Sequence, residues 1–129
     1  MSSPVQHIVD LTNAERARAG LGAVHVDQRL MNAAHGHSAD QAARSSMSHT
    51  GADGSNVAGR VGRQGYAFRW VAENVAWGYG DAAAVVAGWM GSSGHRANIL
   101  SGSATHVGVG LAYAANGTPY WTQVFASPG

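Results

Sequence analysis

Apolar residues recur at the 3.6-residue spacing of an amphipathic helix in four segments of the chain. We predict helices over residues 3–19, 27–44, 55–64 and 81–90. The first begins with Ser3 and Pro4, a capping side chain followed by a residue that suits the first helical turn. Asp27 and Asp81 are the predicted N-caps of the second and fourth helices, because a carboxylate can accept hydrogen bonds from the free amides there.

Alternating apolar and polar residues indicate strands in three further segments. We predict strands over 68–77, 105–111 and 119–125, with a loop rich in turn-forming residues over 45–54. Asn116-Gly117 lies between the last two strands and favours a tight hairpin turn. Helices that cover one antiparallel sheet predict a layered α+β domain.

The composition narrows the class of protein. A length of 129 residues, with 45% hydrophobic and 12% charged residues, predicts a single folded domain over 1–129 rather than a disordered chain. The net charge is +1 and the eight arginines form no basic run, so nothing supports a nucleic-acid partner. The sequence has no apolar stretch of about 18 residues, which excludes a membrane-spanning helix. We expect a monomer.

The sequence contains neither a cysteine nor a visible signal peptide. The chain has no cysteine, which excludes disulfides and thiolate chemistry. Its first residues show no basic segment followed by an apolar core, so no signal peptide is visible. Either the protein stays inside the cell, or a signal has been removed and Met1 is not the native start.

A short polar motif follows the fourth predicted helix. Residues 94–100 read Gly-His-Arg-Ala-Asn-Ile-Leu and come after the small, flexible run 91–93. An imidazole beside glycine at the end of a helix is a candidate site residue, so we single out His95. Alternatively, His95 only caps the helix, where the helix dipole favours a partly positive ring. We expect Arg96 and Asn98 to hold a turn here.

Glu73 is a second candidate, because it is one of only two glutamates and stands in an apolar predicted strand. Buried charges are usually paired or functional. Glu73 therefore either belongs to a site or is neutralised by Arg96 or by backbone amides. Several serines stand near histidines in the sequence, but no Gly-x-Ser-x-Gly elbow is present, which argues against a serine hydrolase.

Four short motifs occur in order along the chain: Ser48-His49, Ala72-Glu73-Asn74-Val75-Ala76, Trp89 with Gly94-His95-Arg96-Ala97-Asn98-Ile99-Leu100, and Tyr120-Trp121-Thr122-Gln123-Val124. Together they resemble the CAP superfamily of cysteine-rich secretory, antigen 5 and pathogenesis-related 1 proteins, also called SCP-like. The resemblance is closest to the short, cysteine-free bacterial members. It extends from Asn13 and Arg16 in the first helix to the last strand.

This resemblance implies a three-layer α-β-α sandwich with a small central antiparallel sheet, and an extracellular or cell-envelope location. It also implies a cleft built on two histidines and two acidic residues, which in several relatives holds a divalent metal such as zinc. His49 and Glu73 match the first histidine and the first acid. Ser92 and Tyr120 stand where relatives outside bacteria have the second acid and the second histidine. We expect His95 to occupy the side of the cleft where this chain lacks the second acid and the second histidine.

The expected site is therefore His49, Glu73 and His95, with zinc or another divalent cation as the cofactor. Asp53, Ser92, Tyr120 and His106 are expected to line the cleft. Glu73 could be a metal ligand, a hydrogen-bond acceptor that orients a histidine, or a general base. Of the remaining side chains, we expect His35 and His37 to be structural or solvated. We expect the four tryptophans to pack in the core and on the sheet rather than to form a platform for a carbohydrate or a base.

Three functions fit these expectations. The favoured one is a secreted, non-enzymatic module that binds a divalent metal and a small ligand, lipid or peptide. The first alternative is a zinc-dependent hydrolase or peptidase with Glu73 as general base. The second alternative is a lipid or sterol carrier.

Overall fold

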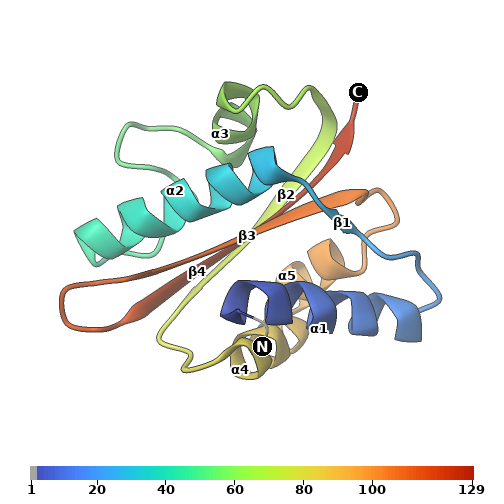
Figure 1. Cartoon of the computed structure of the whole chain (residues 1–129), viewed down its shortest axis with the longest axis horizontal. Coiled ribbons are helices and arrows are strands. Elements are labelled where there is room, and N and C mark those ends of the chain that lie inside the picture. Colours follow the sequence, from blue (N-terminus) through green and yellow to red (C-terminus); the bar gives the residue numbers. More distant parts are fainter. Residues whose placement is uncertain (1–2) are drawn as a thin grey trace.

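Four strands form one sheet within residues 3–129, the part of the chain that the computed structural model describes (Figure 1). The strands are β1 (His25–Val26), β2 (Phe68–Trp77), β3 (His106–Tyr113) and β4 (Pro119–Pro128), in the spatial order β1-β3-β4-β2. Strands β3 and β4 form the predicted hairpin, and β2 pairs antiparallel with β4. The two-residue β1, which the pattern did not predict, joins the edge of β3 in parallel.

Helices cover both faces of this sheet, which confirms the predicted α-β-α sandwich. Helices α2 (Gln28–Arg44) and α3 (Val57–Arg63) lie on one face, and α1 (Pro4–Arg18), α4 (Ala82–Met90) and α5 (Ser93–Ile99) lie on the other (Figure 1). Among residues 3–129, no helix has the length and apolar character needed to cross a membrane.

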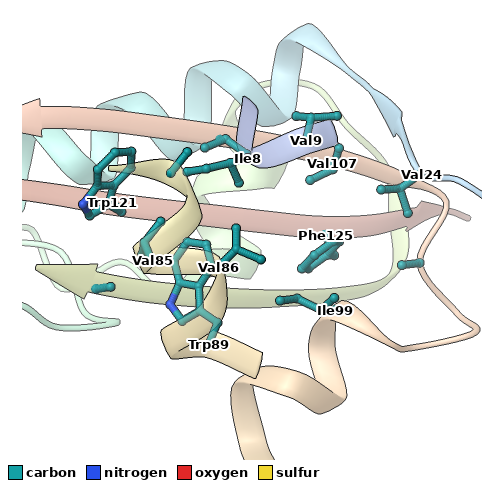
Figure 2. Packing of buried hydrophobic residues seen from close by; sticks show 14 residues of the cluster. Ile8, Val9, Val24, Val85, Val86, Trp89, Ile99, Val107, Trp121 and Phe125 are labelled. Carbon is teal, nitrogen blue, oxygen red and sulfur yellow. The ribbon is translucent and has the colours of Figure 1, made fainter. Parts of the chain in front are cut away.

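The larger part of the hydrophobic core fills the face that carries α1, α4 and α5. Trp89 and Trp121 are each 2% exposed there and pack with Ile8, Ile99 and Phe125, which are fully buried. The labelled side chains in Figure 2 come from these helices, from strands β3 and β4, and from the segment just before β1. A smaller apolar cluster lies between α2, α3 and the opposite face.

The helices begin at capping side chains. The Ser3, Asp27 and Asp81 side chains accept hydrogen bonds from the amides of residues 6, 29 and 84, as predicted. Helix α3 begins at Val57, two residues later than expected, because Asn56 caps it through the Gly59 amide. Side-chain oxygens thus satisfy amides that would otherwise lack a partner.

The prediction of a turn over residues 94–100 is wrong, because this segment forms most of helix α5. Asn98 Nδ2 donates to the backbone carbonyl of Glu73 and, at 2.9 Å, to Asn74 Oδ1, while Ile99 is fully buried. These tertiary contacts stabilise a short helix that contains glycine and has too few apolar residues to show helical spacing.

A chain of buried polar side chains crosses the same face of the sheet. Asn74 Nδ2 donates to Gln123 Oε1 at 3.0 Å, and Gln123 Nε2 donates to Thr12 Oγ1 at 2.8 Å. With Asn98, this network connects α1, β4, β2 and α5. Because Thr12, Asn74 and Gln123 are all fully buried, each amide depends on its protein partners.

Helix α2 lies directly against β3, and two glycines of that strand permit the close approach. A Cβ atom added to Gly108 would overlap the backbone of Leu30, and one added to Gly110 would overlap the backbone of Ala34. Both overlaps are with main-chain atoms, which cannot swing aside as the end of a side chain can. The spacing between α2 and the sheet therefore depends on glycine at these two positions.

Candidate functional site

Glu73 is the centre of a buried ionic cluster on the α2 and α3 face of the sheet. Its side chain is 1% exposed, and its two oxygens have separate partners. Arg60 Nη2 donates to Oε2 at 2.8 Å, and His49 Nδ1 donates to Oε1 at 2.9 Å. The neighbouring Asn74 points to the other face, as the alternation of a strand requires. The structure therefore brings His49 and Glu73 together.

Arg60, and not Arg96, neutralises Glu73, so the expected pairing with Arg96 is wrong. Arg96 lies on the exposed side of α5, whereas Arg60 projects from α3 toward β2 and is 8% exposed. Arg60 also donates to the carbonyl oxygens of Ser55 at 2.8 Å and His49 at 3.0 Å. One guanidinium thus pairs with the buried carboxylate and fixes both ends of the loop that carries His49.

His37 completes the cluster, although the sequence analysis did not place it in the site. Its ring is fully buried, and its Nε2 lies 2.6 Å from the Ser48 carbonyl oxygen and 3.9 Å from Glu73 Oε1. Because a carbonyl only accepts, Nε2 carries the proton and Nδ1 is a bare acceptor, which has no partner among the described residues. His37 lies at helical spacing from the buried residues Leu30, Ala34 and Gln41, and this spacing could have predicted that His37 is buried.

His49 presents its free nitrogen to solvent. The ring is 61% exposed, and its Nδ1 proton is used in the bond to Glu73. A carboxylate oxygen can only accept this bond, so Nδ1 is the donor and the second nitrogen, Nε2, is not used in it. A carboxylate behind a histidine is the arrangement that orients metal-binding imidazoles in proteins.

His95 of α5 lies close to His49. Partial burial is the main cause that lowers the pKa of the His95 imidazole, and the nearby charge of His49 lowers it further. His95 is therefore neutral at pH 7. It lines a cleft of about 400 Å³ between the end of β2, α4 and α5, together with Ser92, Met47, Trp77 and Tyr79.

Among residues 3–129, Ser92 is the only other expected site residue that lines this cleft, and His49 and Glu73 do not line it. Tyr120 is 5% exposed and packs against Ala42 and Ala114, so it contributes to the core. His106 Nδ1 and the Tyr66 hydroxyl form a hydrogen bond of 2.8 Å at the start of β3, away from His95. Neither Tyr120 nor His106 is therefore among the residues that line the cleft of His95.

Asp53 lies at a different cavity. It pairs with Arg63 at 2.7 Å, and hydrogen bonds from Ser55, followed by this arginine, hold the pKa of its carboxyl well below the usual range. The cavity has a volume of about 330 Å³ and lies between α2, α3 and the loop that joins them. His37 and Arg60 also line it.

The expected three-residue metal set of His49, Glu73 and His95 does not form. No three His, Asp or Glu side chains are grouped for metal binding in the part of the chain that the structure describes. Both oxygens of Glu73 are already bound, by Arg60 and His49. The donors that fit a divalent cation are the imidazoles of His49 and His95, with Glu73 orienting the first.

The buried His37 predicts a pH dependence of stability. Burial is the main cause that lowers the pKa of this imidazole below 6.5, while the Glu73 charge acts in the opposite direction. The unfolded chain binds this proton more readily than the folded one, so the free energy of unfolding rises with pH. We expect the His37 contribution to be complete above pH 6.5 and lost as the pH falls below it.

Urea unfolding of the His37→Gln variant, measured at several pH values with EDTA present, tests this expectation. The variant should lose less stability on acidification than the parent, with some slope remaining because the pKa of His95 is lowered in the same sense. His35→Gln is the matched control, since His35 is an exposed residue of the same helix. Parallel pH profiles for the parent and His37→Gln would contradict the assignment.

Comparison with known proteins identifies the class of this fold and site. The chain belongs to the cysteine-rich secretory protein (CAP) family, whose profile matches residues 9–125. The match covers all the elements of the sandwich from within α1 into β4. The earlier resemblance is thereby confirmed, and the family name holds for a chain that itself contains no cysteine.

Three similar proteins come from bacilli. YkwD, an uncharacterized protein of Bacillus subtilis, is 34% identical over 125 residues, which cover 97% of this chain and 48% of that protein. YlbC, an uncharacterized membrane protein of the same species, is 35% identical over 120 residues, covering 93% and 33%. The chain therefore spans between a third and about half of the curated relatives it matches.

A solved structure supports the fold directly. The crystal structure of an extracellular protein containing an SCP domain, from Bacillus anthracis, superposes with a TM-score of 0.86 at 33% identity. The alignment covers 95% of this chain and 40% of that one. The α-β-α sandwich described above is thus the architecture of an SCP domain.

Proposed function

We propose that this CAP domain is a non-enzymatic binding module in which the cleft lined by His95 takes a small ligand, while His49 and His95 hold a divalent cation beside it. The observation that carries the proposal is the orientation of His49 by Glu73 through Nδ1, which leaves Nε2 outside this bond and near the His95 imidazole. When bound, the cation would supply positive charge to attract an oxygen or nitrogen of the ligand. The residues of the chain hold and orient it.

We further propose that the domain works outside the cytoplasm, as a monomer. The similar Bacillus anthracis protein is described as extracellular, and the similar YlbC as a membrane protein. A small ligand, a lipid or a peptide was expected as the partner. The volume of the cleft, about 400 Å³, lies in the range of small-molecule sites, roughly 300–1,000 Å³.

The contacts of Glu73 weigh against the hydrolase alternative. A general base must reach the proton that it removes and must have an oxygen free to receive it. Glu73 is 1% exposed, and Arg60 and His49 bind both of its oxygens. The carboxylate is placed to orient His49 rather than to activate water.

A narrow groove weighs against the lipid-carrier alternative. Leu11 of α1 and Val86 and Met90 of α4 line an apolar groove on the outside of the helical layer. Its volume is about 180 Å³, which is below the roughly 300 Å³ at the lower end of sites for drug-sized ligands. A sterol would leave most of its surface in water.

Zinc titration calorimetry tests the metal part of the proposal. We expect a saturable heat for the parent protein and a roughly tenfold or greater loss of affinity, about 1.4 kcal/mol, when His49→Ala and His95→Ala are combined. His35→Ala is the control, because it removes an exposed histidine from the opposite helical layer and should leave the heat unchanged. Equal heats for the parent and the double variant would overturn the proposal.

A further inference from the structure

Exposed aromatic side chains gather at the mouth of the cleft. Trp77 is 56% exposed, Tyr79 is 39% exposed and Met47 is 44% exposed, and all three line the same hollow as His95. The expectation that all four tryptophans pack in the core is thus wrong for Trp77, which ends β2. Large apolar side chains that remain in contact with water and converge on one cleft are typical of a binding surface.

The cleft combines these aromatic rings with uncharged polar groups. Within the described part of the chain, residues 3–129, no acidic or basic side chain other than His95 lines it. Its hydrogen-bonding side chains are His95, Ser92 and Tyr79, and Ser92 makes no side-chain bond to cap α5, so its hydroxyl is available. With no cation bound, a charged ligand would find no opposite charge in this lining. The side chains themselves therefore favour an uncharged ligand with both apolar faces and hydroxyl groups.

We propose that the cleft binds an uncharged oligosaccharide, with the apolar C–H face of one pyranose ring stacked on Trp77 and Tyr79. Imidazole and hydroxyl groups of His95 and Ser92 would exchange hydrogen bonds with the sugar hydroxyls. This inference rests on the proposed function, since it names the ligand class of the same cleft. An acyl chain fits less well, because it would bury His95 and Ser92 without partners.

The placement of Tyr79 depends on a glycine in α4. A Cβ atom added to Gly88 would lie 2.5 Å from the Tyr79 hydroxyl oxygen and 2.6 Å from Cζ, so the ring rests directly on the helix at this position. Trp121 Nε1 donates to the Tyr79 carbonyl at 3.1 Å and fixes the backbone. Glycine is less favourable than alanine inside a helix, so position 88 gives up helix stability while it accommodates the ring.

This geometry provides two variants that should both weaken sugar binding. Trp77→Ala removes the larger exposed ring and should weaken sugar binding roughly tenfold. Gly88→Ala should displace the Tyr79 ring, which can swing away, and weaken binding while the melting temperature stays the same or rises. Tyr113→Ala is the matched control, because Tyr113 is 63% exposed on β3 and does not line the cleft.

Binding is measured by NMR titration of the intact chain with tri-N-acetylchitotriose and with cellotriose, in EDTA and again with zinc. We expect saturable shifts for at least one sugar, reduced in Trp77→Ala and Gly88→Ala and unchanged in Tyr113→Ala. Absence of saturation for both sugars, or equal affinity of Trp77→Ala and the parent, would overturn the inference. Binding of a sulfated oligosaccharide with no binding of the neutral sugars would overturn the ligand class.

The two proposals can fail separately. If zinc binds through His49 and His95 but neither sugar binds, the metal part of the proposed function stands and this inference is wrong. If a sugar binds in EDTA and zinc gives no heat, the cleft retains its ligand and only the metal part is wrong.

Discussion

Replacing Arg60 by methionine should lower the free energy of unfolding by about 3–5 kcal/mol, the loss expected when one partner of a buried ion pair is removed. The substitution leaves the Glu73 carboxylate buried with only His49 as a partner. It also removes the Arg60 donors to the carbonyls of Ser55 and His49. The measurement is urea unfolding followed by circular dichroism.

Arg63→Met provides the matched control within the same helix. Arg63 pairs with Asp53 at 2.7 Å, but the two side chains are 58% and 56% exposed, so the expected loss is at most about 1 kcal/mol. The double variant Arg60→Met/Glu73→Gln should be more stable than Arg60→Met alone, because it buries no unpaired charge. Equal losses for Arg60→Met and Arg63→Met would show that burial does not determine the strength of the pair.

Gly108→Ala should destabilise the fold by about 3 kcal/mol, at the upper end of the usual cost of overpacking a core. The added methyl group would overlap the backbone of Leu30, so either α2 must move off the sheet or β3 must bend. Thermal and urea unfolding measure the loss. Displacement of α2 would also change the environment of His37, which NMR detects directly.

Gly36→Ala is the control for this prediction. Gly36 lies on the exposed side of α2, and a Cβ atom added there meets no other atom within 4 Å. Alanine is the better helix former, so this variant should gain up to about 1 kcal/mol. If Gly108→Ala were as stable as the parent, the close packing of α2 on β3 would not be required for the fold.

The sequence was sufficient to predict elements that depend on local signals. Capping side chains and the Asn-Gly turn are read within a few residues, and the helices and the hairpin formed where they were predicted. Helix α5 could not be found in this way, because it is stabilised by contacts of Asn98 with a strand about 25 residues earlier in the chain. The edge strand β1 is likewise defined only by its pairing with β3.

The candidate site shows the same difference between residues found from local motifs and residues defined by tertiary contacts. His49 and Glu73 were expected together on the family motifs, and the structure places them 2.9 Å apart. Arg60 and His37 were missed because their importance comes from burial against Glu73, which two separate helices create. For Trp77, the residue type predicted a buried side chain. The ring is instead exposed to solvent, because Trp77 lies at the end of strand β2.

The polar network between Asn74, Gln123, Thr12 and Asn98 has a consequence for the assembly of the sheet. Asn74 is paired with Gln123 across β2 and β4, and Glu73 with Val124. If β2 slipped by one residue, Asn74 would turn to the α2 face and Glu73 into the apolar layer beneath α4. Such a misaligned sheet would bury a free carboxylate and several unpaired amides, so this network acts against misfolded alternatives as well as for the native state.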